Sequence, residues 1–169
     1  MGLTLRTPRL ADEALAEILR GEFEADGFGS ALKPLDGQTW ADWVASLPFW
    51  SRGENLPEGL VAFDCFIAEV EGEPVGYVSF RHNLNTETLR SWGGHIGYVV
   101  RPNCRQRGYA TLMLEQTLAV AKSQGLSQVL VTCDENNMAS ARVIEKCHGV
   151  YESTYEHDDK RTRRYWIAL

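Results

Sequence analysis

The chain has 169 residues, of which 44% are hydrophobic and 24% charged, a composition that excludes a disordered protein and fits one globular domain over residues 1–169. The formal net charge is −6, with 15 acidic and 7 basic side chains in residues 1–90 but 8 acidic and 10 basic ones in residues 91–169. This acidic balance argues against nucleic acid as a partner. The sequence has no long apolar run and no basic, apolar leader, so we expect no membrane partner and no secretion.

The four cysteines indicate a reducing compartment. They form no C-x-x-C pair, and none has a metal-like spacing with a histidine. We therefore expect a cytoplasmic protein without a metal site.

The first third of the chain predicts short elements around an irregular stretch. Residues 3–6 alternate like a strand, and Asp12 is a candidate N-cap for a helix that runs to about Phe23. Glycines and prolines interrupt residues 27–59, within which residues 40–47 have helical periodicity. The apolar face of that helix holds Trp40, Trp43, Val44 and Leu47. We expect core or lid packing for the tryptophans rather than direct contact with a substrate.

From residue 63 onward the pattern predicts three strands, a helix, a strand, a second helix and two final strands. The predicted strands are residues 63–71, 75–81, 94–100, 128–133, 150–156 and 162–169. The predicted helices are residues 109–124 and 139–147, the second with Asn137 as its N-cap. Strand–helix–strand order implies parallel pairing in the centre, whereas hairpins imply antiparallel pairing elsewhere. A mixed sheet follows.

The turn between residues 99 and 111 is a candidate anion site. A strand end leads through a polar basic turn into a helix start, whose first N–H groups have no intrahelical partner. Gly108 permits close approach of a ligand to the backbone, and Arg105 and Arg107 add positive charge. The arrangement predicts phosphate binding.

These residues resemble the GNAT superfamily of acyl-CoA-dependent N-acetyltransferases. Arg105, Gly108 and Ala110 match the family's phosphate-loop signature, the preceding run from Tyr98 is similar to its central strand, and the run from Asn137 is similar to its second cofactor segment. The resemblance implies an α/β (α+β) fold. Its sheet would be mixed and mostly antiparallel, with about six to seven strands and about four helices. Its parallel central strands would splay around the cofactor.

The resemblance also implies acetyl-CoA as the co-substrate. The N–H groups of about Gln106 to Thr111 would hold the pyrophosphate, and the central strand would pair with the pantetheine arm. Asn137 would meet the arm from the other wall, a role compatible with a plain N-cap. The implied cofactor-binding residues are Tyr98, Val99, Val100, Arg105, Gln106, Arg107, Gly108, Tyr109, Ala110, Thr111 and Asn137.

The reaction that the resemblance implies is direct attack of a primary amine, in a small molecule or a peptide, on the thioester. His95 is the first candidate base and Glu69 the second, while a histidine that only bonds within the sheet stays open for His95. Ile144 stands where many relatives carry the tyrosine that protonates the thiolate. The sequence does not choose among its possible substitutes, which are Tyr98, Tyr151, Tyr155 and Tyr165.

The sequence is also compatible with a function other than catalysis. The missing tyrosine and the undecided base leave a non-catalytic acyl-CoA-binding sensor or partner module as the alternative to an enzyme. The acidic first half favours cationic amines as acceptors. Dimers are frequent in the superfamily, so the resemblance allows a homodimer.

Overall fold

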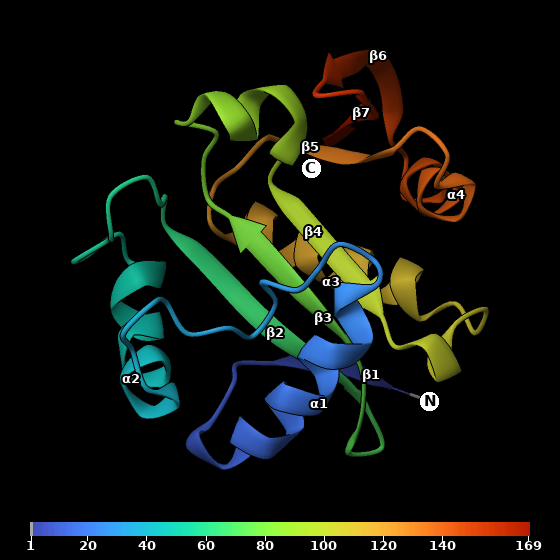
Figure 1. Cartoon of the computed structure of the whole chain (residues 1–169). Helices are drawn as coiled ribbons and strands as arrows, with labels where there is room; N and C mark the ends of the chain where they lie inside the picture. The colour runs from blue at the N-terminus through green and yellow to red at the C-terminus, as the bar shows by residue number, and fades with distance from the viewer. Residues whose placement is uncertain (1) are drawn as a thin grey trace.

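Seven strands form one sheet in the order β1-β2-β3-β4-β5-β7-β6 in the computed structural model, which describes residues 2–169 (Figure 1). The strands are β1 (Leu3–Arg6), β2 (Phe63–Val70), β3 (Glu73–Arg81), β4 (Ile96–Val100), β5 (Gln128–Asp134), β6 (Val150–His157) and β7 (Lys160–Ala168). The helices are α1 (Glu13–Glu24), α2 (Trp40–Ser51), α3 (Tyr109–Ser123) and α4 (Met138–Lys146). Short helical turns cover Leu10–Asp12, Leu89–Gly93 and Pro102–Cys104. The predicted mixed fold is confirmed.

The sheet opens between its two central strands. Neighbouring strands pair antiparallel except β4 and β5, which are parallel. These two strands share a single register pair, Ile96 with Val131, and then separate. Beyond Ile96 the edge of β4 that faces β5 therefore has no strand partner in the part of the chain that the structure describes.

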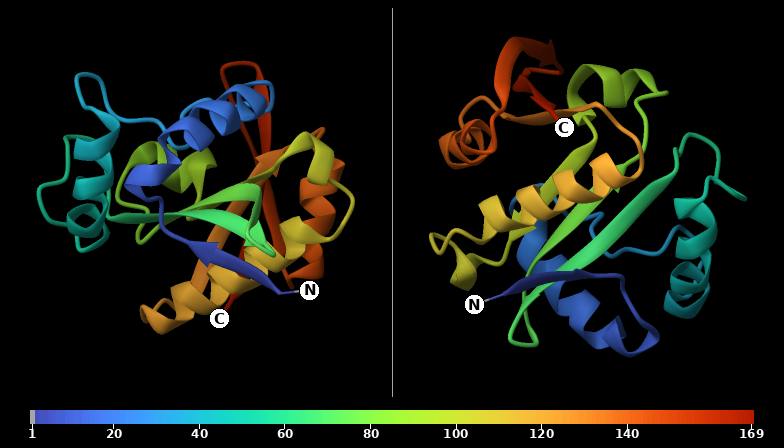
Figure 2. Two further views of the ribbon diagram at one scale, coloured as in Figure 1. Left: turned by 90° about the horizontal axis from the view of Figure 1, so that it is seen from below. Right: turned by 180° about the vertical axis from the view of Figure 1, so that it is seen from behind.

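Helices cover both faces of the sheet. Figure 2 shows α1 and α2 on one face and α3 and α4 on the other. Alternate residues of the central strands pack into these two layers, since successive side chains of a strand point to opposite faces. Tyr77 and Val99 are buried with α1 and α2, whereas Val78 and Ile96 are buried with α3. The predicted period of two is confirmed.

The tryptophan helix is longer than the sequence predicts. Helix α2 continues through Pro48 to Ser51, because Pro48 lies on its exposed side and the next turn buries Trp50. Trp40, Trp43 and Trp50 are at most 5% exposed, which confirms the expected core packing. Thr39 and Asp42 form a capping box at the start of this helix.

Two further observations bear on the expected site. The four cysteines are free. Within residues 2–169, no helix is both long and apolar enough to cross a membrane, and no three metal-ligating side chains gather as a metal site would require.

Candidate active site

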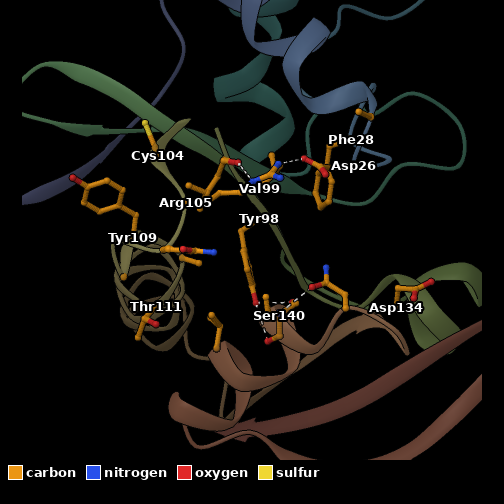
Figure 3. A pocket seen from close by; sticks show the side chains of 18 of the residues that line it. Asp26, Phe28, Tyr98, Val99, Cys104, Arg105, Tyr109, Thr111, Asp134 and Ser140 are labelled. Carbon is orange, nitrogen blue, oxygen red and sulfur yellow. Dashed lines mark hydrogen bonds and ion pairs between the residues drawn. The ribbon is translucent and has the colours of Figure 1, made fainter. Parts of the chain in front are cut away.

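A cavity of about 830 Å³ opens where β4 and β5 separate. Its walls are the edge of β4, the turn that leads into α3, the start of α4, and the loop after α1. The side chains that Figure 3 labels around it include Tyr98, Arg105, Tyr109 and Ser140. The turn before α3 is therefore brought together with the start of α4, as the sequence predicts.

The start of α3 presents unpaired backbone N–H groups to this cavity. Gly108 is the N-cap residue, with φ of 81° and no side-chain cap. The first intrahelical bond runs from the N–H of Leu112 to the carbonyl of Gly108, so the N–H groups of residues 109–111 have no helical partner. Gln106, Gly108, Tyr109, Ala110 and Thr111 all line the cavity. Such a helix end attracts anions.

The two arginines of the turn differ. Arg105 lines the cavity, but its guanidinium forms an ion pair with Asp26, in the loop after α1 (Figure 3). Its Nε also donates to the Val100 carbonyl at 3.2 Å. Arg107 does not line the cavity. The positive charge predicted for this turn is thus partly neutralised by Asp26.

Alternate residues of β4 direct their backbone N–H and C=O groups toward its open edge. The Arg81 N–H bonds to the His95 carbonyl, and the Arg101 N–H bonds to the Val75 carbonyl. By the alternation of an antiparallel ladder, the backbone groups of Val99 then face β3, and those of Tyr98 and Val100 face the opening. All three residues line the cavity.

Tyr98 crosses the opening toward α4. Its hydroxyl lies 2.9 Å from the Ser140 Oγ (Figure 3). Burial raises the pKa of Tyr98, so the phenol stays protonated at neutral pH. Asn137 also lines the cavity, and its side chain accepts a hydrogen bond from the Ser140 N–H at 3.0 Å, which confirms that it caps α4.

His95 lies outside the cavity lining and bonds within the sheet. Its Nδ1 accepts the Leu130 N–H at 2.9 Å, and its ring is an edge-on neighbour of Trp166. Burial lowers the pKa of His95 to about 4. A neutral ring that accepts at Nδ1 carries its proton on Nε2, so Nε2 is a donor. This geometry favours a structural role over proton abstraction.

Glu69 lies on β2, which β3 separates from the cavity-lining strand β4. It is next to the edge strand β1, where its Oε1 accepts the Arg6 Nε–H at 2.7 Å. Arg6 also pairs with Asp12 at 2.6 Å. The structure therefore gives Glu69 an ion pair that joins β1 to β2, and does not bring it together with His95.

The sequence model of the acetyltransferase (GNAT) domain family matches residues 2–150. The chain belongs to the GNAT acetyltransferase family. No curated protein sequence matches it.

Solved GNAT structures share the fold at low sequence identity. RimJ from Mycobacterium smegmatis, in complex with CoA-disulfide, has a TM-score of 0.68 and 22% identity, covering 99% of this chain and 82% of that one. Spermidine N-acetyltransferase from Vibrio cholerae, in complex with CoA and spermine, has a TM-score of 0.66 and 16% identity, covering 98% and 95%. The enzyme from Salmonella typhimurium that modifies the N-terminal serine of ribosomal protein L7/L12 has a TM-score of 0.66 and 17% identity, covering 99% and 95%.

Ile144 is a core residue and does not line the cavity. Its side chain is fully buried in the core beneath α4. His148, two residues after the end of α4, takes the left-handed backbone conformation, with φ of 68°. Gly149 then passes so close to the Ile144 carbonyl that a Cβ would lie 2.8 Å from it.

Sequence reasoning missed the residues that complete the cavity from other elements. Asp26 and Phe28 come from the loop after α1, and Ser140 comes from α4. The loop has no motif, and only its glycines on either side of Phe28 mark it as a turn. Ser140 had a weak signal, since it is the N3 residue after the Asn137 cap.

Proposed function

We propose that this GNAT protein transfers the acetyl group of acetyl-CoA to a primary amine in a ternary complex. The observation that carries the proposal is the cavity between β4 and β5, which joins an open strand edge to an uncapped helix start. The first feature suits the amides of a pantetheine arm, and the second suits a pyrophosphate. CoA-bound structures with the same fold support this assignment.

The chain's own residues fit this co-substrate. The N–H groups of about Gln106 to Thr111 hold the pyrophosphate, and the outward backbone groups of Tyr98 and Val100 pair with the arm. Arg105 reaches phosphate when it leaves Asp26. Asn137 lines the opposite wall while it caps α4. Arg107, Tyr109 and Ala110 complete the turn.

The reaction forms a carbon–nitrogen bond and breaks a carbon–sulfur bond. As the amine attacks the thioester carbonyl, negative charge builds first on the oxygen and then on the departing sulfur. The outward N–H of Tyr98 or Val100 stabilises the oxygen, because the N–H of Val99 faces β3. Tyr98 replaces the missing tyrosine at Ile144, donating a hydrogen bond from its hydroxyl to the sulfur. Of the four candidate tyrosines, Tyr98 alone lines the cavity.

The proton of the amine goes to water in this scheme. His95 and Glu69 were the predicted bases, but the neutral His95 ring already uses Nδ1, and Glu69 pairs with Arg6. An alkylamine of pKa near 10.4 is neutral about once in two thousand molecules at pH 7, a cost of roughly 4–5 kcal/mol. Positioning the neutral amine beside the thioester offsets that cost, because well-oriented reactants lower a barrier by several kcal/mol, about 7–11 in favourable cases.

Two measurements test the proposed function. Calorimetry tests whether the protein binds acetyl-CoA. Release of free thiol with a panel of primary amines and peptides tests whether it transfers the acetyl group. Binding followed by amine-dependent thiol release supports the enzyme. Binding without release from any amine favours the alternative, a non-catalytic acyl-CoA sensor, and failure to bind removes both.

A further inference from the structure

Arg81 lies over the backbone of β4 at the point where the sheet opens. It is the last residue of β3, and its neighbour across the strands is His95. Its Nη1 is 3.2 Å from the position that a Cβ on Gly97 would occupy, and the Ser79 Oγ and the Phe28 ring are the next neighbours. Because Gly97 has no side chain, there is space above its Cα, and the Arg81 guanidinium lies at the edge of that space.

This guanidinium has no partner of opposite charge. Among residues 2–169, no carboxylate forms an ion pair with Arg81, and no side chain or carbonyl accepts a hydrogen bond from its guanidinium. Of the other partly buried arginines, Arg6, Arg101 and Arg164 each pair with a carboxylate, and Arg20 donates to the Leu32 carbonyl at 3.0 Å. Burial lowers the pKa of Arg81, but an arginine stays charged at neutral pH. Arg81 is only partly buried, and no buried side-chain nitrogen of residues 2–169 lacks a hydrogen-bond partner, so its unpaired guanidinium is in contact with solvent and an anion can reach it.

The site of this charge adjoins the reaction centre from the side opposite α3 and α4. Arg81 follows Tyr77 and Ser79 on alternate positions of β3, and Tyr77 packs with the α1–α2 layer. Tyr98 reaches α4 from the other face, and Gly97 directly precedes it. Phe28 touches the Gly97 position and also lines the cavity.

His95 adds a hydrogen-bond donor on the same face. Residues directly opposite each other on antiparallel strands have their side chains on the same face of the sheet, so the side chains of His95 and Arg81 share one face. Its Nδ1 is occupied by the Leu130 N–H, which leaves the proton on Nε2. The face thus carries a fixed cation and a neutral N–H donor.

We propose that Arg81 binds a carboxylate of the acceptor, so that the substrate is a small molecule that carries both the reacting amine and an acid. The inference rests on the proposed function and narrows its acceptor class. It also reverses the expectation from net charge that cationic amines are preferred, because the local charge of this face is positive. His95 Nε2 is the second donor to the same acid group. The guanidinium further lowers the pKa of the nearby ammonium, which helps to supply the neutral amine.

Matched acceptors test the inference on the unmodified protein. We would measure thiol release, and separately binding in the presence of CoA, for leucine, leucinamide and isopentylamine, and for glutamate, glutamine and spermidine. We expect at least one acid-bearing amine to bind and react about 10- to 100-fold better, in kcat/KM, than its amide or its decarboxylated analogue, as one charge-assisted pair would give.

Variants separate recognition from folding. Arg81→Met should remove the preference for the acid while acetyl-CoA affinity stays unchanged, and Arg81→Lys should restore part of it. Arg52→Met is the matched control, since Arg52 is an exposed arginine of the α2 end that pairs with Glu54. Thermal unfolding of each variant checks that the fold persists.

Each outcome decides the inference. Equal or better binding and turnover of amides, simple amines or spermidine by the wild type overturns it, and so does an acid preference that survives Arg81→Met. A panel in which no acid-bearing amine binds or reacts also overturns it. If the protein binds acetyl-CoA and acetylates only amines without an acid, the proposed function stands and this inference fails. If it binds no acetyl-CoA, the proposed function itself fails.

Discussion

Leu130 and His95 join β4 to β5 by two hydrogen bonds directly before the strands separate. The His95 N–H donates to the Leu130 carbonyl at 2.7 Å, and the Leu130 N–H donates to the His95 Nδ1 at 2.9 Å. The second bond needs a lone pair on Nδ1, and the 6% exposed ring has no room for a solvated charge. The imidazole therefore acts as a fixed acceptor that closes the base of the opening.

This role makes stability depend on pH. In the folded protein the pKa of His95 falls from 6.5 to about 4, so the unfolded chain binds the proton first as the pH drops. The stabilisation from a neutral His95 is complete above pH 6.5 and decreases from there to about pH 4, by about 3 kcal/mol in all. Urea unfolding at several pH values between 4 and 7.5 measures this loss of unfolding free energy.

His95→Asn is the informative control. The Asn Oδ1 occupies the place of Nδ1 and accepts a hydrogen bond, but it does not titrate. The difference in unfolding free energy between wild type and variant should therefore shrink or change sign as the pH falls, since carboxylates titrate equally in both. A constant difference across this range would show that His95 titrates normally.

Local patterns predicted the sheet better than the site. Strand alternation and helix starts depend on neighbours in sequence, as in β2, β3 and β5 and at Gly108 and Asn137. The order of the elements and the phosphate-type turn could therefore be predicted. The end of α2 could not, because a proline predicts a stop and only the tertiary burial of Trp50 overrides it.

The catalytic candidates depended on contacts across the chain. His95 bonds to a residue 35 positions away and Glu69 to one 63 positions away, and neither pairing leaves a local signal. The same holds for the ion pair between Asp26 and Arg105, and for Arg81, which has no ion-pair partner within residues 2–169. The sequence identifies reactive residue types, but only the fold shows which of them already have hydrogen-bond or ion-pair partners.

Glu69→Gln should leave turnover within about twofold of wild type, because Glu69 faces Arg6 on the far side of β2. Stability should fall by about 1 kcal/mol or less, since the Arg6–Asp12 pair remains. Steady-state thiol release and urea unfolding check the two parts. A tenfold loss of kcat in a folded variant would restore Glu69 to the mechanism.

Gly108→Ala and Gly125→Ala form a matched pair at the two ends of α3. Their φ angles are 81° and 88°, and a Cβ at either position meets nothing within 4 Å. Each substitution should cost about 1–2 kcal/mol of stability through backbone strain alone. Only Gly108→Ala should also weaken acetyl-CoA binding, by about tenfold, because only that turn lies on the cavity. Equal affinities by calorimetry would contradict the placement of the pyrophosphate.

Tyr98→Phe removes the hydroxyl and keeps the backbone edge of β4. We expect kcat to fall about tenfold or more, as for a hydrogen bond to a charged group, with acetyl-CoA affinity nearly unchanged. Tyr165→Phe is the control, since Tyr165 is a buried tyrosine that does not line the cavity. Single-turnover thiol release separates chemistry from product release. Unchanged chemistry in Tyr98→Phe would remove the tyrosine from leaving-group stabilisation.

Asp26→Asn should strengthen the binding of CoA. The Asp26 carboxylate neutralises Arg105 at the mouth of the cavity, with side chains 35% and 45% exposed, so replacing it frees a cation and removes a like charge from the phosphates. At low salt we expect affinity to rise about two- to fivefold, a gain that shrinks as salt screens exposed charges. Glu22→Gln is the control, because Glu22 pairs with Arg101 outside the cavity lining. If Arg105→Gln abolishes the gain in the double variant, the released guanidinium is its source. A gain that persists without Arg105 would instead assign the effect to the repulsion between Asp26 and phosphate.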